Sequence, residues 1–482
     1  MPINVEVERE NIEEKWIGFS PSSNSVKPAH IANGLFRTVL DATFDTQLLH
    51  GFVFSQTKEG EVPKGHDIDT IYERLIKEHK IEESDVAKDT LGRLRILLKK
   101  VVGADDAVFT GAMQSYSAGF SSFVAKDTIA QDGGELIAAW FQRNSPLLHT
   151  LVKDSLLSDN DTITRMCIPL LSNKSAVYNS SFDFDDVRFL NAPLPQPIDD
   201  LWKGLAEAAT TLAEHVETHP NKLLRLRLIV LFASFVLIRE LSWLEAMYVP
   251  GAEKSLQPIL LDFSTSNATA ISQASEVTYT RICQSIARFY AWAFGEQLRM
   301  SFTLDDLRRE QTPVYKKRSK PEMEEVWRLA SLEAEEGLEG FTVYGQALYD
   351  ILAQEAEGHP VGYLRQLGSR IGLLTPPTNF FPTKRFRLQQ DLLETLVRGA
   401  IHPGEVLDMP SLQDRFWLRY GLVIGGRPID ERRLLEAGIY QADTDALQEN
   451  RHHCASRLGA LDFASLLADG VLQIEVGAPR VV

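Results

Sequence analysis

The residues best suited to chemistry are Asp262, Ser264 and Ser266, which stand at the end of the short apolar segment 259–263. One carboxylate and two hydroxyls can gather a hard divalent cation, because such cations prefer oxygen ligands. The pattern therefore predicts a divalent metal site. The same residues are also typical of a strand that leads into a helix, where serine and asparagine side chains cap free amides.

The spacing Asp-x-Ser-x-Ser after an apolar strand resembles the metal-ion-dependent adhesion site of von Willebrand factor A domains. That resemblance implies a metal-binding recognition domain around Asp262, with a threonine supplied by a later loop. Thr342 lies at a suitable distance along the chain for this role. The family also needs a further aspartate after another strand, and no such strand and aspartate occur near residues 370–380.

A second acidic group, Asp183, Asp185 and Asp186, could hold Mg²⁺ as the carboxylates of metal-dependent nucleases do. No lysine stands at the short spacing that a PD-(D/E)xK nuclease requires. Phenylalanine alternates with aspartate in this segment, which is also typical of a half-buried strand with one wet face.

Other patterns predict no catalytic site. His452, His453 and Cys454 are adjacent, and neighbouring helical residues point too far apart to converge on one ion. Ser117 lacks the first glycine of a nucleophile elbow, and the chain contains no GxxxxGK[ST] phosphate loop. We therefore expect no intrinsic ATPase activity and no cofactor.

The basic segment 379–388 interleaves Lys384, Arg385 and Arg387 with three phenylalanines. Basic side chains can neutralise phosphates while aromatic rings stack or anchor the segment, so these three residues are predicted to contact nucleic acid. Alternatively, the phenylalanines dock a linker onto a hydrophobic core.

Composition indicates a folded globular protein of more than one domain, with 482 residues, 44% hydrophobic residues and a net charge of −16. This charge argues against nucleic-acid contact over most of the surface but leaves room for a local basic face. The opening residues contain no apolar stretch typical of a secretory signal, and the three cysteines form no CxxC pair. A cytoplasmic location is the simplest interpretation.

Helical periodicity dominates the chain and predicts a mainly α fold. The segment 221–248 predicts a helix surrounded by other helices, because its apolar run 228–238 is too short to cross a bilayer. Proline-rich segments suggest three parts. We expect an N-terminal helical domain (1–192), a central helical domain (198–375) and a C-terminal winged-helix-like module (380–482).

Further elements are expected within these parts. They are helices at 71–78, 89–102, 199–218, 272–299, 321–338, 343–357, 388–398 and 411–420, a helix capped by Asp430, and strands at 259–263, 422–424 and 471–476.

These observations favour a non-enzymatic adaptor or scaffold subunit of a multiprotein complex. Its expected partners are other protein subunits, such as an ATPase or a nuclease, with nucleic acid contacted through the C-terminal region and no membrane. The large, acidic, helical chain resembles accessory subunits of bacterial phage-defence systems, which implies an antiviral role. The alternatives are the metal-binding domain around Asp262 and a nuclease that uses Asp183, Asp185 and Asp186.

Overall fold

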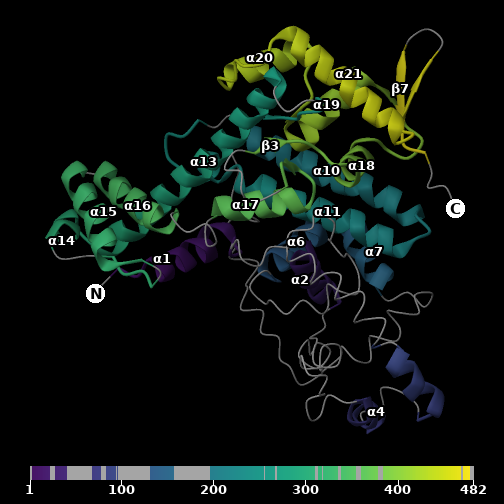
Figure 1. Cartoon of the computed structure of the whole chain (residues 1–482), viewed down its shortest axis with the longest axis horizontal. Helices are drawn as coiled ribbons and strands as arrows, with labels where there is room; N and C mark the ends of the chain where they lie inside the picture. The colour runs from purple at the N-terminus through teal and green to yellow at the C-terminus, as the bar shows by residue number, and fades with distance from the viewer. Residues whose placement is uncertain are drawn as a thin grey trace.

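The computed structural model shows a mainly helical protein with a few short strands (Figure 1). The residues that it describes are 3–21, 28–40, 68–77, 83–93, 95, 131–156, 196–253, 256–265, 269–309, 313–316, 318–334, 338–353, 360–377, 384–467 and 471–477.

The N-terminal part of the chain contributes several helices to the described structure. Their bounds are α1 (Val5–Ile12), the π-helical turn η1 (Glu13–Ile17), α2 (Pro28–Leu40), α4 (Ile68–Lys77), α6 (Gln131–Asn144) and α7 (Pro146–Leu156). Helices α2 and α6 pack closely, because Gly134 brings its backbone against that of Ile31 and Leu35. A side chain at Gly134 would overlap these atoms.

A helical hairpin forms the core of the central part. Helix α10 (Gln196–Thr218) and helix α11 (Lys222–Leu241) are separated at His219 and Pro220, because proline lacks the amide hydrogen that continues a helix. The expected helix 221–248 is divided, since a turn at Ser242 and Trp243 precedes α12 (Leu244–Tyr248).

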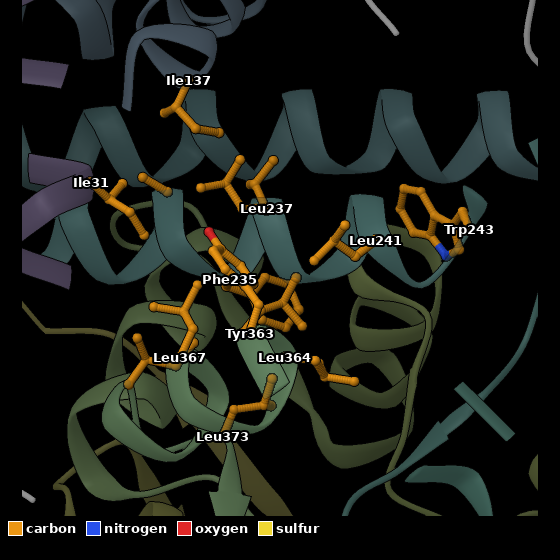
Figure 2. Packing of buried hydrophobic residues seen from close by; sticks show 14 of the residues in the cluster. Ile31, Ile137, Phe235, Leu237, Leu241, Trp243, Tyr363, Leu364, Leu367 and Leu373 are labelled. Carbon is orange, nitrogen blue, oxygen red and sulfur yellow. The ribbon is translucent and has the colours of Figure 1, made fainter. Parts of the chain in front are cut away.

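Helix α11 is enclosed by its neighbours, and every residue from 228 to 238 is buried. Figure 2 shows Phe235 and Leu237 of α11 among side chains from α2, α6 and α17. None of the described helices is long and apolar enough to cross a membrane.

A second group of helices surrounds α13, the longest element of this region. Their bounds are α13 (Ala270–Ser301), α14 (Leu304–Arg309), α15 (Lys320–Glu333), α16 (Leu338–Ala353) and α17 (Pro360–Arg370). Gly345 of α16 lies against the backbone of Ala291 of α13, so the two helices approach closely. Helices α14, α15 and α16 lie together at one end of the molecule (Figure 1).

The C-terminal part combines four helices with short strands. Its helices are α18 (Gln390–Ala400), α19 (Met409–Tyr420), α20 (Pro428–Glu436) and α21 (Thr444–Ala460). Its strands are β3 (Arg385–Phe386), β4 (Val406–Asp408), β5 (Leu422–Val423), β6 (Ala464–Leu466) and β7 (Leu472–Glu475).

Three small sheets connect these strands. Strand β1 (Ile259–Leu260) runs parallel to β5, and β2 (Leu374–Thr375) runs antiparallel to β3. The third sheet is antiparallel in the order β4-β7-β6, with Leu407 and Ala464 both opposite Ile474.

The expected cap of α20 was wrong. The helix begins at Pro428 after Arg427, because proline suits the first helical position, and Asp430 lies within the first turn. The buried Asp430 carboxylate accepts hydrogen bonds from Arg427 and Arg433 instead.

The main hydrophobic cluster has members from Ile3 to Val476, so all three predicted parts contribute to it. The proposed boundaries at 192–198 and 375–380 lie partly outside the described residues.

Candidate functional site

The best candidate site is built at the end of β1. The backbone of β1 continues past its pairing with β5, and the Leu261 amide donates to the Val423 carbonyl at 2.9 Å. The next amide, that of Asp262, turns to β3 and donates to the Phe386 carbonyl at 2.7 Å. Asp262 therefore lies where segments from the central and C-terminal parts meet.

The Asp262 carboxylate is fully buried and already has protein partners. The backbone amide of Ser264 donates to Oδ1 at 2.8 Å, and the Ser264 hydroxyl donates to the same oxygen. On the other side, Arg385 Nε lies 3.1 Å from Oδ2. The two atoms are not aligned for a hydrogen bond, so their attraction is that of a buried ion pair.

Asn450 of α21 holds the surrounding backbone. Its side-chain oxygen accepts from the Phe263 amide at 2.7 Å, and its side-chain nitrogen donates to the carbonyls of Leu261 and Ile424. Because an asparagine side chain both donates and accepts, this single buried residue satisfies three backbone groups that the strands leave open.

Arg457 of α21 lies near Asp262, and Arg387 lies near Arg457. Arg457 Nη1 donates to the Leu388 carbonyl at 2.9 Å, and its guanidinium lies 5.8 Å from the centre of the Phe263 ring. Burial lowers the pKa of Arg457, and the positive charge of Arg387 lowers it further. Within the described part of the chain, the Arg387 side chain has no hydrogen bond or ion pair. Arg385 and Arg457 thus lie near the Asp262 carboxylate, and Arg387 adds a third positive charge beside Arg457.

A pocket of about 360 Å³ opens beside these arginines, and we call it the arginine pocket. It is lined by Thr375, Arg387, Leu388, Gln389, Gln390, Leu393, Arg457, Ala460 and Leu461. Helix α18 begins at this pocket, and the side chain of Gln389 does not cap it. The leucines supply an apolar wall, while the arginines and glutamines supply donors.

The three basic residues predicted to contact nucleic acid have different surroundings. Lys384 is buried and donates to the Pro376 carbonyl, and burial together with the nearby charge of Arg365 lowers the pKa of Lys384 to about 8. Arg385 pairs with Asp262. Arg387 is half-buried and is the member of the group that lines the arginine pocket.

The other predicted residues are dispersed or lie outside the described chain. Ser266, Asp183, Asp185 and Asp186 belong to segments that the structure does not describe. The backbone of Thr342 lies against Gly295 of α13, whereas Ser275, near the start of that helix, donates to the Leu260 carbonyl of β1. Twenty helical residues rise about 30 Å, so Thr342 is far from Asp262.

No group of three or more histidine, cysteine, aspartate or glutamate side chains that could hold a metal ion occurs among the described residues. Cys454 is buried, and burial raises the pKa of its thiol well above the ordinary value. His452 beside it is exposed.

An arrangement that sequence reasoning missed joins an acid, a histidine and a hydroxyl. His402 Nδ1 lies 2.8 Å from Glu214 Oε2, and its Nε2 lies 3.4 Å from the Thr211 hydroxyl. The order resembles that of a nucleophilic triad, but Thr211 is fully buried and its oxygen accepts from Arg419 Nη1 at 2.9 Å. This hydroxyl cannot meet a substrate, so the arrangement fastens α10 to the segment after α18.

Two ionisable residues of α11 are buried in a different way. Among the described residues, none forms a hydrogen bond with the guanidinium of Arg239 or the carboxyl group of Glu240, although Arg239 lies over the Trp243 ring at 4.9 Å. Burial lowers the pKa of Arg239 to about 9 and raises that of Glu240 well above its ordinary value. Consecutive helical residues point about 100° apart, so the two cannot neutralise each other.

The Asp262–Arg385 pair thus joins two residues that sequence reasoning assigned to different sites, and Arg457, which it did not single out, completes the arginine pocket with Arg387. Their separation along the chain left no local signal by which the sequence could connect them. Comparison with protein-family models, with curated proteins and with solved structures gave no match for this chain.

Proposed function

We propose that this protein is a non-enzymatic adaptor or scaffold subunit of a larger assembly, and that a basic amphipathic helix of a partner binds in a groove between α15 and α16. This groove, which we call the acidic groove, has a volume of about 510 Å³. It is lined by Val326, Leu329, Ala330, Glu333, Val343, Gln346, Ala347, Asp350 and Ala353. The proposal rests on this combination of apolar and acidic lining residues.

The two helices are fixed from their inner side. The rings of Trp327 and Tyr344 lie 4.7 Å apart, and Trp327 Nε1 donates to the Leu307 carbonyl at 3.1 Å. The acidic groove is therefore a preformed surface, which lowers the entropy lost when a partner binds.

The apolar lining suits the hydrophobic face of a helix. Leu329 is 46% exposed although it lies between smaller apolar side chains of the groove. Helix-in-groove recognition places residues at positions i, i+3, i+4 and i+7 in such a surface.

The charged lining selects a basic partner. Glu333 and Asp350 are the charged residues of the groove, and both are acidic. Asp350 is half-buried and receives a hydrogen bond from Gln346 Nε2 at 2.8 Å, and burial raises the pKa of Asp350. A lysine of the partner would pair with this carboxylate and favour its charged form.

The experiment is fluorescence anisotropy of a labelled peptide that carries leucines at helical spacing and lysines on its flanks. We expect binding to the full chain, and at least tenfold weaker binding to Leu329→Gln. Leu332→Gln is the matched control, because Leu332 lies on the same helix, is 72% exposed and does not line the groove. A peptide with glutamates in place of the lysines should not bind.

Equal binding of both peptides, or equal weakening by the two substitutions, would rule out the acidic groove as the partner site.

A second candidate function, nucleic-acid binding, follows from the proposed winged-helix-like nature of the C-terminal part. The elements occur in the order α18, β4, α19, β5, α20, α21, β6 and β7, and the sheet order is β4-β7-β6, with β5 paired to β1 instead. Winged-helix modules have a helix, a strand and further helices, followed by a two-stranded wing that pairs with the first strand. Nucleic-acid contact, an antiviral role and a cytoplasmic location stay predictions of the sequence.

The nucleic-acid prediction can be tested on the full chain with labelled duplex DNA at several salt concentrations. If Arg387 and Arg457 each neutralise one phosphate, the log–log salt slope should be about −1.8. Arg387→Gln should flatten it by about 0.9. A slope that the substitution leaves unchanged would remove Arg387 from the interface.

A further inference from the structure

We propose that the arginine pocket binds the phosphate group of a phosphomonoester. This inference is independent of the scaffold role and is an alternative to binding of nucleic-acid backbone phosphates by the same two arginines. It assigns the pocket a chemical class of ligand. The phosphate could belong to a small molecule such as a mononucleotide or to the end of a nucleic-acid strand, and the experiment below distinguishes these sources.

The first argument is the local excess of positive charge. The chain carries a net charge of −16, yet Arg385 pairs with Asp262, Arg457 lies near the same carboxylate, and Arg387 lies near Arg457. Arg385 neutralises that carboxylate from within the core. The charges of Arg387 and Arg457 remain on the wall of the pocket and repel each other.

An anion between these two arginines would remove the repulsion. Charge-assisted hydrogen bonds from guanidinium groups to phosphate are among the strongest in proteins, and they are frequently bidentate. Arg457 uses Nη1 for the Leu388 carbonyl, which orients the guanidinium beside the pocket and leaves further N–H groups for a ligand. Arg387 has all of its donors available in the described structure.

The start of α18 adds to the same field. The helix has 11 residues, and its first amides face no side-chain cap from Gln389. Its dipole places partial positive charge at this end. The carboxylate of Asp391 in the first turn is engaged by Arg227, so the nearest acid of the helix has its own cation.

The volume of the pocket exceeds what a bare phosphate needs. At about 360 Å³ it falls in the range typical of small-molecule sites. Leu388, Leu393 and Leu461 line it together with the polar residues. We infer that the apolar wall holds the organic part of the ligand while the arginines hold its phosphate.

The experiment is isothermal titration calorimetry of the full chain with inorganic phosphate, AMP and adenosine at low salt. We expect AMP to bind, phosphate to bind more weakly and adenosine not to bind. Arg387→Gln should weaken AMP binding at least tenfold. Arg432→Gln is the matched control, because Arg432 is an exposed arginine of α20 outside the pocket.

A second substitution guards against loss of structure. Arg457→Lys keeps the charge but loses the planar guanidinium group, so we expect it to bind AMP more weakly than the parent chain does. The melting temperature of Arg387→Gln should equal that of the parent chain, which would show that this variant is folded. Parent-like binding by Arg387→Gln, or no binding of AMP and phosphate to the parent chain, would overturn the proposal.

A competition experiment with bound AMP identifies the source of the phosphate. A single-stranded oligonucleotide with a 5′-phosphate should displace AMP if the ligand is a strand end, whereas the same oligonucleotide without that phosphate should not. Binding of AMP without displacement by either strand identifies a small molecule as the ligand. Displacement by both strands alike would show that internal backbone phosphates bind, which contradicts a monoester site.

Discussion

The acidic groove and the arginine pocket lie in different regions of the molecule and differ in charge. The groove lies between α15 and α16, has a mostly apolar lining and carries Glu333 and Asp350 on its wall. The pocket lies among β3, α18 and α21 and presents Arg387 and Arg457. The groove shares the sign of the whole chain, whereas the pocket opposes it. A net charge therefore describes long-range behaviour and says little about a particular site.

The pocket also shows how neighbouring arginines acquire different roles. Arg385 and Arg387 are separated by one residue, yet Arg385 is 5% exposed and paired, whereas Arg387 lines the pocket. A buried charge needs its partner for the fold to persist, but a half-exposed charge can remain unpaired in water. The first arginine is a structural residue, and the second is available to a ligand.

The largest expected effect separates these roles by stability. Asp262→Ala removes the carboxylate that pairs with the buried Arg385 and should lower the free energy of unfolding by about 3–5 kcal/mol. Arg387→Gln should change it by less than about 0.5 kcal/mol. Urea unfolding followed by circular dichroism measures both. Adding Arg385→Met to Asp262→Ala should recover part of the lost stability. If Asp262→Ala and Arg387→Gln lower the free energy of unfolding equally, the two arginines do not differ in role.

The buried helix α11 should be sensitive as well. Leu231 of α11 is fully buried, and Leu231→Ala should lower the free energy of unfolding by about 2–5 kcal/mol through lost contacts and a cavity. Leu224 of the same helix is 38% exposed, so Leu224→Ala serves as the control. Thermal unfolding compares them. If Leu231→Ala melts like the control, α11 does not belong to the core.

A pH-dependent effect is expected from Glu240. Because burial raises the pKa of Glu240 in the folded protein, the folded state binds more protons than the unfolded state above pH 4.5. The stabilising contribution of protonated Glu240 is fully present below the pKa of this residue in the unfolded chain. It is lost as pH rises towards its pKa in the folded protein. The slope is at most about 1.4 kcal/mol for each pH unit.

The free energy of unfolding of Glu240→Gln, relative to that of the parent, should therefore be higher at pH 8.0 than at pH 5.5. The exposed Glu217 of the same hairpin provides the control substitution Glu217→Gln. Arg239 also has a shifted pKa, but its lowering to about 9 affects stability only at higher pH. The free energy of unfolding is measured with urea at the two pH values. If the difference in this free energy between Glu240→Gln and the parent is the same at both, the interpretation is wrong.

The smallest expected effect on stability concerns the acidic groove. Leu329→Gln and Leu332→Gln replace exposed side chains and should each change the free energy of unfolding by less than about 0.5 kcal/mol. Their difference should appear in peptide binding alone. A large loss of stability in Leu329→Gln would mean that the side chain supports α15 instead of a partner.

Much of the local structure could be predicted from the sequence. Apolar spacing placed the helices that became α10, α13, α15, α18 and α19, and His219-Pro220 marked a break that the structure confirms. These features depend on neighbours within a few residues. The predictions were less accurate where packing intervenes, as at Trp243, where the expected single helix divides in two.

The candidate site could be predicted only in fragments. The sequence singled out Asp262, Arg385 and Arg387 by residue type, but it assigned the first to a metal and the other two to nucleic acid. Their mutual contact depends on strands that are far apart along the chain, and Arg457 comes from a third element.

The sequence by itself determined where helices form, because periodicity and proline act within one or two turns of chain. The tertiary structure alone decided which charged side chains meet. Burial made the Asp262–Arg385 pair a structural contact, and partial exposure left Arg387 and Arg457 facing a pocket. Desolvation and Coulomb attraction depend on distance in space, and one-dimensional spacing does not encode that distance.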